Sequence, residues 1–299
     1  MEFSAAHFED VPDELCWEHC NGRCQEGSQP CCCSREPLTT AHETNRIVFI
    51  GAGLSSIEAA KLVLKSGGEP LILERSPFFG GIWVSAANRE SRVQVDPISF
   101  RAIEEDSRPA LSQPDPNNPF DSGYPTRADV LRRLAIDVKA AQLRQRAMFN
   151  IELLRFEVLA NRDVKLYLKQ AGNVGLHRPA CRWSSKEQCP CCTKSDGEYS
   201  VVVRQLHVRT GSLTHGLHRA KALQFPNIES FGGKLRQGIG DDVTLAEFKD
   251  KNVVIVGMGA FGVENTRRAL RGGAKSVTVL SRRFDKLLFP ERVSYLLRS

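Results

Sequence analysis

The sequence lacks any apolar run long enough to cross a bilayer, and we expect no signal peptide. Its N-terminal segment is acidic, with Glu9, Asp10, Asp13 and Glu14, where a secretory signal would be basic and then apolar. A basic tail is absent too, because the formal charge of +6 is spread along the chain. We therefore expect a soluble cytoplasmic protein with no membrane span and no nucleic-acid partner.

Cysteine is abundant, but the sequence lacks the two matched C-x-x-C pairs of a zinc finger. The ten cysteines form two clusters, which are Cys16, Cys20, Cys24 and Cys31 to Cys33, and then Cys181, Cys189, Cys191 and Cys192. One interpretation is a zinc clip made by a few of these thiols, with His19 beside the first cluster. The other is exposed thiols in two irregular segments, and without matched pairs we predict no metal site.

Two segments have the pattern of a β-α-β unit with a glycine-rich turn. In the first, the predicted elements are a strand at Arg46 to Ile50, a helix at Ser56 to Ser66 and a strand at Pro70 to Glu74. In the second they are a buried strand at Val253 to Val256, a helix at Val263 to Ala269 and a strand at Ser276 to Leu280. An apolar strand before the glycines and a helix after them are the context of a dinucleotide-binding motif, whereas glycines in an ordinary turn are the alternative.

The first glycine turn predicts a dinucleotide with an unmodified ribose. Gly51 permits the tight turn, Gly53 lets the backbone approach a pyrophosphate at the helix N-terminus, and Ser56 replaces the third glycine. Glu74 ends the second strand, where its carboxylate can accept hydrogen bonds from the ribose.

The second turn predicts a different dinucleotide. All three glycines of the motif are present, at Gly257, Gly259 and Gly262. The position of Glu74 is taken by Ser281, which Arg282 and Arg283 follow. A hydroxyl and two guanidiniums can bind a 2′-phosphate that a carboxylate would repel, so the pattern favours NADP over NAD. The alternative is two arginines that only cover a surface.

Between the two units we predict a helix and an antiparallel meander. Thr126 and Asp129 form a capping box for the helix, whose buried face comprises Val130, Leu131, Leu134, Ala135 and Val138. Its solvated side is predicted to carry Arg132, Arg133, Arg144 and Arg146. The meander strands are expected at Phe156 to Leu159, Val164 to Lys169 and Tyr199 to Val208. A long loop at residues 88 to 122 precedes the helix.

Several motifs resemble those of flavin-containing monooxygenases over about residues 45 to 299. The signature E-x5-G-G-x-W is matched from Glu74 through Gly80 and Gly81 to Trp83, and Gly51 to Ser55 matches the segment before it. Further matches are Tyr124-Pro125-Thr126, Thr210-Gly211 in place of A-T-G, and Phe231 to Gln237 in place of F-x-G-x-x-x-H. The departures are Arg209 for Ala, Gln237 for His, and Asp96 where the family has an Asn near the flavin.

The resemblance implies an α/β protein with two Rossmann-like parts. We expect an irregular leader at residues 1–43, an FAD-binding domain at 44–240 that contains the meander and a surface insertion at about 172–197, and the start of an NADP-binding domain at 250–299. Ser55, Ser56, Gly80, Gly81, Trp83, Thr210 and Gly211 are expected to join Gly51, Gly53 and Glu74 at FAD, while the second turn takes NADPH. An ordinary core position is the alternative for Trp83.

The resemblance also implies a reaction. NADPH would reduce FAD, dioxygen would give a flavin C4a-hydroperoxide, and a small molecule with a soft nitrogen or sulfur nucleophile would be oxidised. The protein would stack the cofactors and exclude water, so no catalytic residue is assigned. The sequence predicts neither the substrate nor the oligomeric state.

Two alternative functions stay open. A pyridine-nucleotide disulfide reductase is disfavoured because no cysteine lies between Cys33 and Cys181 or after Cys192. The other is a non-catalytic nucleotide-binding or sensor derivative of the family. Few residues follow Ser281, so we expect the second domain to be incomplete, and the chain alone to be poorly stable with little NADPH oxidation.

Overall fold

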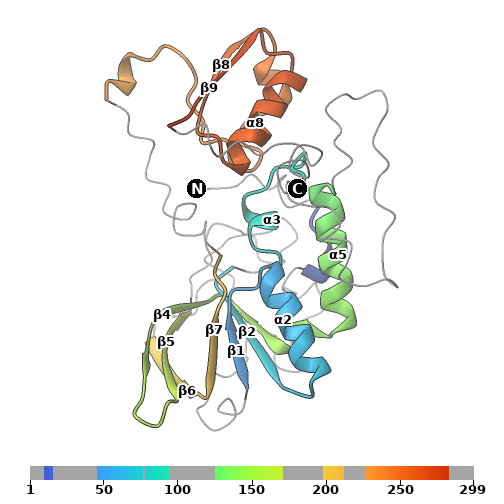
Figure 1. The fold of residues 1–299 in the computed structure, drawn as a ribbon, viewed down its shortest axis with the longest axis vertical. Helices are drawn as coiled ribbons and strands as arrows, with labels where there is room; N and C mark the ends of the chain where they lie inside the picture. The colour runs from blue at the N-terminus through green and yellow to red at the C-terminus, as the bar shows by residue number, and fades with distance from the viewer. Residues whose placement is uncertain are drawn as a thin grey trace, which may run out of the picture. The chain divides into compact units, whose positions relative to one another are not determined.

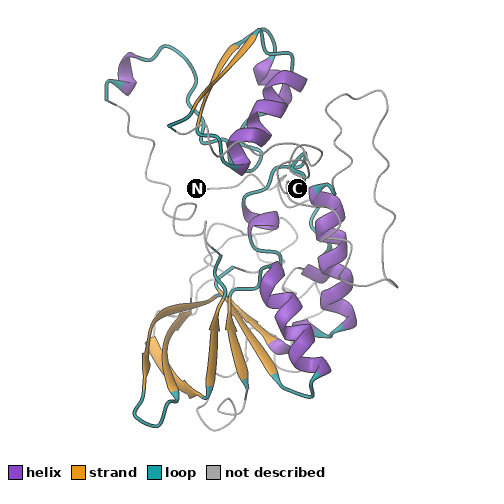
Figure 2. Ribbon diagram, viewed as in Figure 1, coloured by secondary structure: helices purple, strands orange, loops and turns teal. Residues whose placement is uncertain are grey.

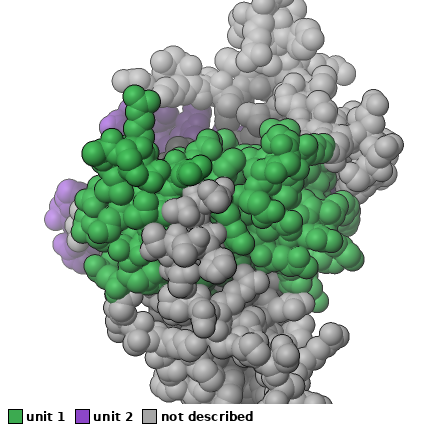
Figure 3. All heavy atoms as spheres, turned by 90° about the horizontal axis from the view of Figure 1, so that it is seen from below, with its two compact units in different colours: residues 1–85, 131–220 green, residues 86–130, 221–299 purple. Residues whose placement is uncertain are grey.

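The computed structural model describes residues 10–15, 46–76, 78–93, 125–170, 198–211 and 226–282. The chain forms two compact units: a first unit of residues 1–85 and 131–220, and a second unit of residues 86–130 and 221–299 (Figure 3). All cysteines, and with them the zinc alternative, lie outside the described residues. The domain boundaries given above stay a prediction. In the described ranges, no helix is long and apolar enough to cross a bilayer.

The first unit contains a four-stranded parallel sheet with the order β3-β2-β1-β7. Its strands are β1 (Ile47–Ile50), β2 (Pro70–Glu74), β3 (Ala147–Phe149) and β7 (Gln205–Val208). Helix α2 (Leu54–Lys65) connects β1 to β2, as the sequence predicts, and β1 pairs in parallel with β2 and β7. Figure 1 shows α2 on one face of this sheet and a second sheet on the other. This order places β1 between β2 and β7. The carboxyl ends of these three parallel strands therefore lie together at one edge of the sheet.

The second sheet is antiparallel, with the order β4-β5-β6 (Figure 2). It comprises β4 (Ile151–Val158), β5 (Val164–Gln170) and β6 (Glu198–Val203). Apolar side chains of both sheets form one buried cluster, namely Val48, Ile50, Leu71, Leu73, Ile151, Leu166, Leu168, Val201 and Val203. The prediction of a single strand from Tyr199 to Val208 is wrong. The chain bends at Arg204, so β6 stays in the meander while β7 pairs with β1.

Helix α5 (Arg127–Ala140) begins and packs as predicted. Asp129 Oδ2 accepts hydrogen bonds from the Thr126 backbone N–H at 2.9 Å and from its hydroxyl at 2.7 Å. All five apolar residues of the predicted face are buried. The assignment of Arg133 to a solvated side is wrong, because Arg133 pairs with the buried Asp137, which also pairs with Lys61. Arg144 and Arg146 follow α5, in the short 3-10 helix Leu143–Arg146.

The second unit contains a β-α-β motif: β8 (Asn252–Val256), α8 (Ala260–Arg271) and β9 (Ser276–Leu280). The two strands pair in parallel. The expectation of a buried β8 is wrong, since Val254 is 59% and Val256 66% exposed. Among the described residues, one face of this two-stranded sheet packs: Val253 and Val277 contact the buried cluster of Val243, Phe248 and Ala269. Alternate side chains of β8 therefore stay at the surface.

A short 3-10 helix before β8, Leu245–Phe248, has a capping box that predicts a pH effect. The backbone N–H of Thr244 donates to Glu247, and this bond, with Lys234 nearby, lowers the pKa of Glu247 from 4.5 to about 2. Its ionised form therefore stabilises the fold above about pH 4.5, and that contribution is lost as the pH falls towards 2. Glu247→Gln should flatten the acid dependence of the urea midpoint in this window. An unchanged dependence would contradict the assignment.

Candidate nucleotide-binding sites

The turn after β1 is tight, and it closes on β7. Gly51 has φ +97°, and its N–H donates to Leu73 O at 2.8 Å. The Arg209 N–H donates to Ile50 O at 2.9 Å, which brings the end of β7 against the turn. A Cβ on Gly51 would lie 2.8 Å from Arg209 O. Only glycine fits here, because both the backbone angle and the neighbouring carbonyl exclude a side chain.

Gly53 differs from Gly51, because the space beside its Cα is open to a ligand. It is the N-cap of α2 with φ −74° and ψ 177°, and no side chain caps the helix. A Cβ built here would lie 3.9 Å from Gly81 Cα, which is ordinary contact. The first turn of an uncapped helix presents free N–H groups and a positive dipole end. This geometry suits an anion such as a pyrophosphate.

The glycine pair Gly80-Gly81, which belongs to the E-x5-G-G-x-W signature, packs against the turn after β1. The Gly80 N–H donates to Ala52 O at 2.9 Å, and Gly80 and Gly81 have φ +115° and +56°. Helix α3 (Ile82–Ser85) follows, and Trp83 lies in it, partly buried. The structure thus brings Gly51, Gly53, Gly80 and Gly81 together, although about 30 residues of sequence separate the two turns.

The leader contributes to the support of this turn in a way that sequence reasoning missed. Val11 and Leu15 are 5% and 0% exposed, and Leu15 O accepts a hydrogen bond from the Phe79 N–H at 2.8 Å. The 3-10 helix Asp13–Leu15 carries this contact. The only signal in the sequence was the spacing of two apolar residues, at i and i+4, among acidic neighbours.

Glu74 has a bracing role that sequence reasoning also missed. Its Oε2 accepts the Ala52 N–H at 2.6 Å, and its Oε1 accepts the Ser76 N–H at 2.7 Å. The carboxylate therefore ties the glycine turn to the end of β2. A carboxylate has about four lone-pair sites, so accepting bonds from a ribose stays compatible with this geometry.

The remaining residues predicted at the first site lie around the same turn. Ser56 is 0% exposed and takes the place of the third glycine in the packed part of α2. Ser55 is exposed in the first turn of α2, and its carbonyl lies 3.4 Å from Arg209 Nη1. Thr210 and Gly211 follow β7 and are exposed, with Gly211 at φ +76°.

The second turn repeats this construction. Gly257 has φ +110° and its N–H donates to Leu280 O at 2.8 Å, while Gly259 is the N-cap of α8, again without a side-chain cap. A Cβ on Gly262 would overlap Gly257 O, so the helix passes close to the turn. Ser281 and Arg282 directly follow β9, whereas Arg283 lies outside the described residues.

Around the two turns, the described residues form no metal site. Within the described ranges, no group of three or more His, Cys, Asp and Glu side chains could hold a metal ion. Asp96 and Tyr124 of the sequence motifs lie outside those ranges. The geometry is that of two phosphate-binding turns, each at the N-terminus of a helix and at the carboxyl end of a parallel strand.

Known proteins are similar to this chain in sequence and in fold. No family model matches the chain. It is 24% identical over 266 residues to flavin-containing monooxygenase FMO GS-OX2 of Arabidopsis thaliana, with 83% of this chain and 51% of the relative covered. Flavin-containing monooxygenase 1 of Mus musculus is 26% identical over 270 residues, with 85% of this chain and 46% of the relative covered. The chain is related to the flavin-containing monooxygenases.

A solved structure supports the fold of this chain. S-allyl-L-cysteine S-oxygenase from Allium sativum matches with a TM-score of 0.52 and 17% identity, over 80% of this chain and 51% of that one. The expected α/β class, with Rossmann-like strand order, is confirmed. The chain spans about half the length of the curated relatives it matches.

Proposed function

We propose that this chain binds FAD at its first glycine turn and NADPH at its second, as part of a flavin-dependent monooxygenase. The observation that carries the proposal is the convergence of Gly51, Gly53 and the Gly80-Gly81 pair at one helix N-terminus. Curated relatives named flavin-containing monooxygenase support it.

The residues at the first turn fit FAD. The cradle at Gly53 is space that a side chain would fill, and the uncapped α2 supplies N–H donors for a pyrophosphate. Glu74 would orient the ribose, and Ser55, Ser56, Gly80, Gly81, Trp83, Thr210 and Gly211 would form the surrounding wall. FAD, once bound and reduced, supplies the activation of dioxygen. The chain's own task is to hold the two cofactors and exclude water from them.

The substrate class and the cellular location of the protein are also proposed. We propose a small molecule with a soft nitrogen or sulfur nucleophile as the oxygen acceptor. The resemblance to flavin-containing monooxygenases implies such a substrate. One protein of similar fold, from Allium sativum, is named as an S-allyl-L-cysteine S-oxygenase. A cytoplasmic location, the expectation stated above, is proposed as well.

An absorption spectrum tests the proposal. The purified chain, reconstituted with FAD, should show bound-flavin absorption that NADPH bleaches slowly without air, in line with the little NADPH oxidation expected above, and that air restores. Failure to retain any FAD would overturn the proposal. Flavin that binds but is never bleached, even on prolonged incubation with NADPH, would favour the second candidate, a non-catalytic nucleotide-binding derivative, which the departures Arg209 and Gln237 from the family motifs support.

NADPH should bind more tightly than NADH. Ser281 and Arg282 follow β9 at the edge where a 2′-phosphate would project, and Arg283 comes next in the sequence. A charge-assisted hydrogen bond contributes about 1.5 to 3 kcal/mol, or roughly one to two decades in affinity. Replacing both arginines with Ala should remove the preference, as measured by titration calorimetry with each nucleotide. Equal affinities for the unmodified chain would refute the assignment.

A further inference from the structure

Arg209 directly follows β7 in the first unit, and its backbone is fixed beside the first glycine turn. Its N–H donates to Ile50 O at 2.9 Å, and a Cβ on Gly51 would lie 2.8 Å from its carbonyl oxygen. Strands β1 and β7 pair in parallel up to Ile50 and Val208. The side chain of Arg209 therefore starts at the carboxyl edge of the sheet, where the turn lies.

This side chain lies on the face of the sheet that α2 covers. The residues on either side of Phe49 belong to the buried cluster shared with the second sheet, so Phe49 faces the other way, towards α2. The His207 ring stacks on Phe49 with the centroids 5.0 Å apart, and Arg209 Cζ lies 5.9 Å from the centroid of the same Phe49 ring. Arg209 Nη1 donates to Ser55 O at 3.4 Å. Because Ser55 lies two residues after the N-cap of α2, the guanidinium is beside the first turn of this helix.

A cation is unfavourable at this place in the protein alone. The N-terminus of a helix carries the positive end of the helix dipole, which anions stabilise, whereas cations are favoured at the C-terminus. The first turn of α2 has no acidic residue and no side-chain cap. The Glu74 carboxylate at this turn already accepts two backbone N–H groups. Within the described ranges, no carboxylate pairs with Arg209, whose polar side-chain contact is the long one to Ser55 O.

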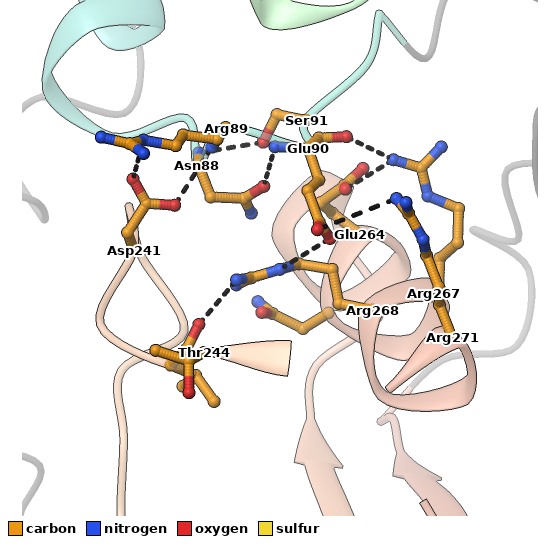
Figure 4. A network of polar contacts seen from close by, with 12 residues as sticks. Asn88, Arg89, Glu90, Ser91, Asp241, Thr244, Glu264, Arg267, Arg268 and Arg271 are labelled. Atoms are coloured by element: carbon orange, nitrogen blue, oxygen red, sulfur yellow. Dashed lines mark hydrogen bonds and ion pairs between the residues drawn. The ribbon is translucent and has the colours of Figure 1, made fainter. Parts of the chain in front are cut away.

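The arginines of α8, in the second unit, show the usual arrangement (Figure 4). Arg268 lies in the last turn of that helix, and its Nε is 3.5 Å from Glu90 Oε2. Arg267 pairs with Glu264 at 2.6 Å. Arg209 differs in both respects, because its guanidinium lies at the N-terminal end of a helix and has no carboxylate partner among the described residues.

We propose that Arg209 binds the diphosphate of the dinucleotide at the first turn, and the inference rests on the FAD site proposed above. A diphosphate at the N-terminus of α2 would accept hydrogen bonds from the helix N–H groups and from the guanidinium together. Its negative charge would neutralise both positive groups. Ser55 is only about 3 Å along the helix axis from the N-cap, so a long and partly exposed arginine side chain reaches this position. The planar guanidinium presents its donors as a fork that matches two phosphate oxygens.

The charge of Arg209 should therefore contribute to FAD affinity in a salt-dependent way. Arg209→Gln keeps a long polar side chain but removes the charge. At an ionic strength of about 0.1 M, this variant should raise the FAD dissociation constant by a factor on the order of ten. At about 1 M the Debye length falls from about 10 Å to about 3 Å, so the factor should fall towards one. Arg209→Lys keeps the charge without the fork and should give an intermediate factor.

The experiment titrates the full chain with FAD at both ionic strengths and follows flavin fluorescence. Arg204→Gln is the matched control, because Arg204 is exposed and precedes β7, at the end of the strand opposite to the turn. It should keep the affinity and the salt dependence of the unmodified chain. The unfolding midpoint of each variant is measured as well. A purely structural role for Arg209, through its packing on Phe49, would lower the midpoint and weaken FAD binding equally at both ionic strengths.

The outcomes separate this inference from the proposed function. If Arg209→Gln binds FAD as tightly as the unmodified chain at the lower ionic strength, or if its loss is the same at both, Arg209 does not bind the diphosphate. The FAD site then stands without it. If the unmodified chain binds no FAD, the proposed function fails and this inference fails with it.

Discussion

Gly53→Val should purify without flavin and still fold. The backbone at Gly53 is extended, so any residue can adopt it, and a Cβ there would meet only Gly81 Cα at 3.9 Å. The two methyl groups of valine would instead occupy the space over the α2 N-terminus that a pyrophosphate needs. We expect the flavin content per mole of protein to fall to the level of a blank, with an unchanged circular dichroism spectrum.

Gly232→Val is the matched control for this variant. A Cβ at Gly232 has nothing within 4 Å, and the residue lies in the second unit. This variant should keep the flavin content of the unmodified protein. Full flavin retention by Gly53→Val would show that the cofactor lies elsewhere.

Asp137→Ala should cause the largest loss of stability. Asp137 is 2% exposed, and its two oxygens accept hydrogen bonds from Lys61 Nζ at 2.9 Å and Arg133 Nε at 3.0 Å. Removing the carboxylate takes away the charge that Lys61 and Arg133 share in a buried place, although Glu58 stays 3.5 Å from Lys61. Breaking a buried ion pair in this way typically costs about 3 to 5 kcal/mol of unfolding free energy. Urea denaturation followed by circular dichroism measures the loss.

Glu152→Ala serves as the comparison for Asp137→Ala. Glu152 pairs with Arg75 at 3.6 Å, but its side chain is 39% exposed, so its loss should change the unfolding free energy by less than about 1 kcal/mol. Similar losses in the two variants would mean that the Lys61–Asp137–Arg133 network is not an important source of stability.

The local elements of the fold could be predicted from the sequence because their signals are local. The strand Pro70–Glu74 and the strand Ser276–Leu280 were predicted to the residue, and each glycine turn lies where its motif is. The Thr126–Asp129 capping box forms as predicted, since its partners are three residues apart. Such features depend on neighbours along the chain, which the sequence displays directly.

The errors share another cause, which is contact between distant residues. Arg133 was assigned to solvent because a charged residue on a helix usually lies there, but its i+4 partner Asp137 is buried where it also binds Lys61, 76 positions away in the sequence, and Arg133 is buried with it. The break at Arg204 depends on the pairing of β7 with β1. Glu90 gave no signal at all, because its arginine partners lie about 180 residues away. The site residues themselves stay predictions until a nucleotide is bound.

The hydrogen bonds of Glu74 mean that the first turn has its shape before any ligand arrives. Fixing the backbone of one residue costs about 1 to 2 kcal/mol of conformational entropy, and folding alone already orders Gly51, Ala52 and Gly53. A dinucleotide that meets this turn therefore loses little affinity to ordering it. In hydrogen exchange, the Ala52 amide should be protected from deuterium in the apoprotein as strongly as in the complex. Glu74→Gln would make that protection depend on the ligand.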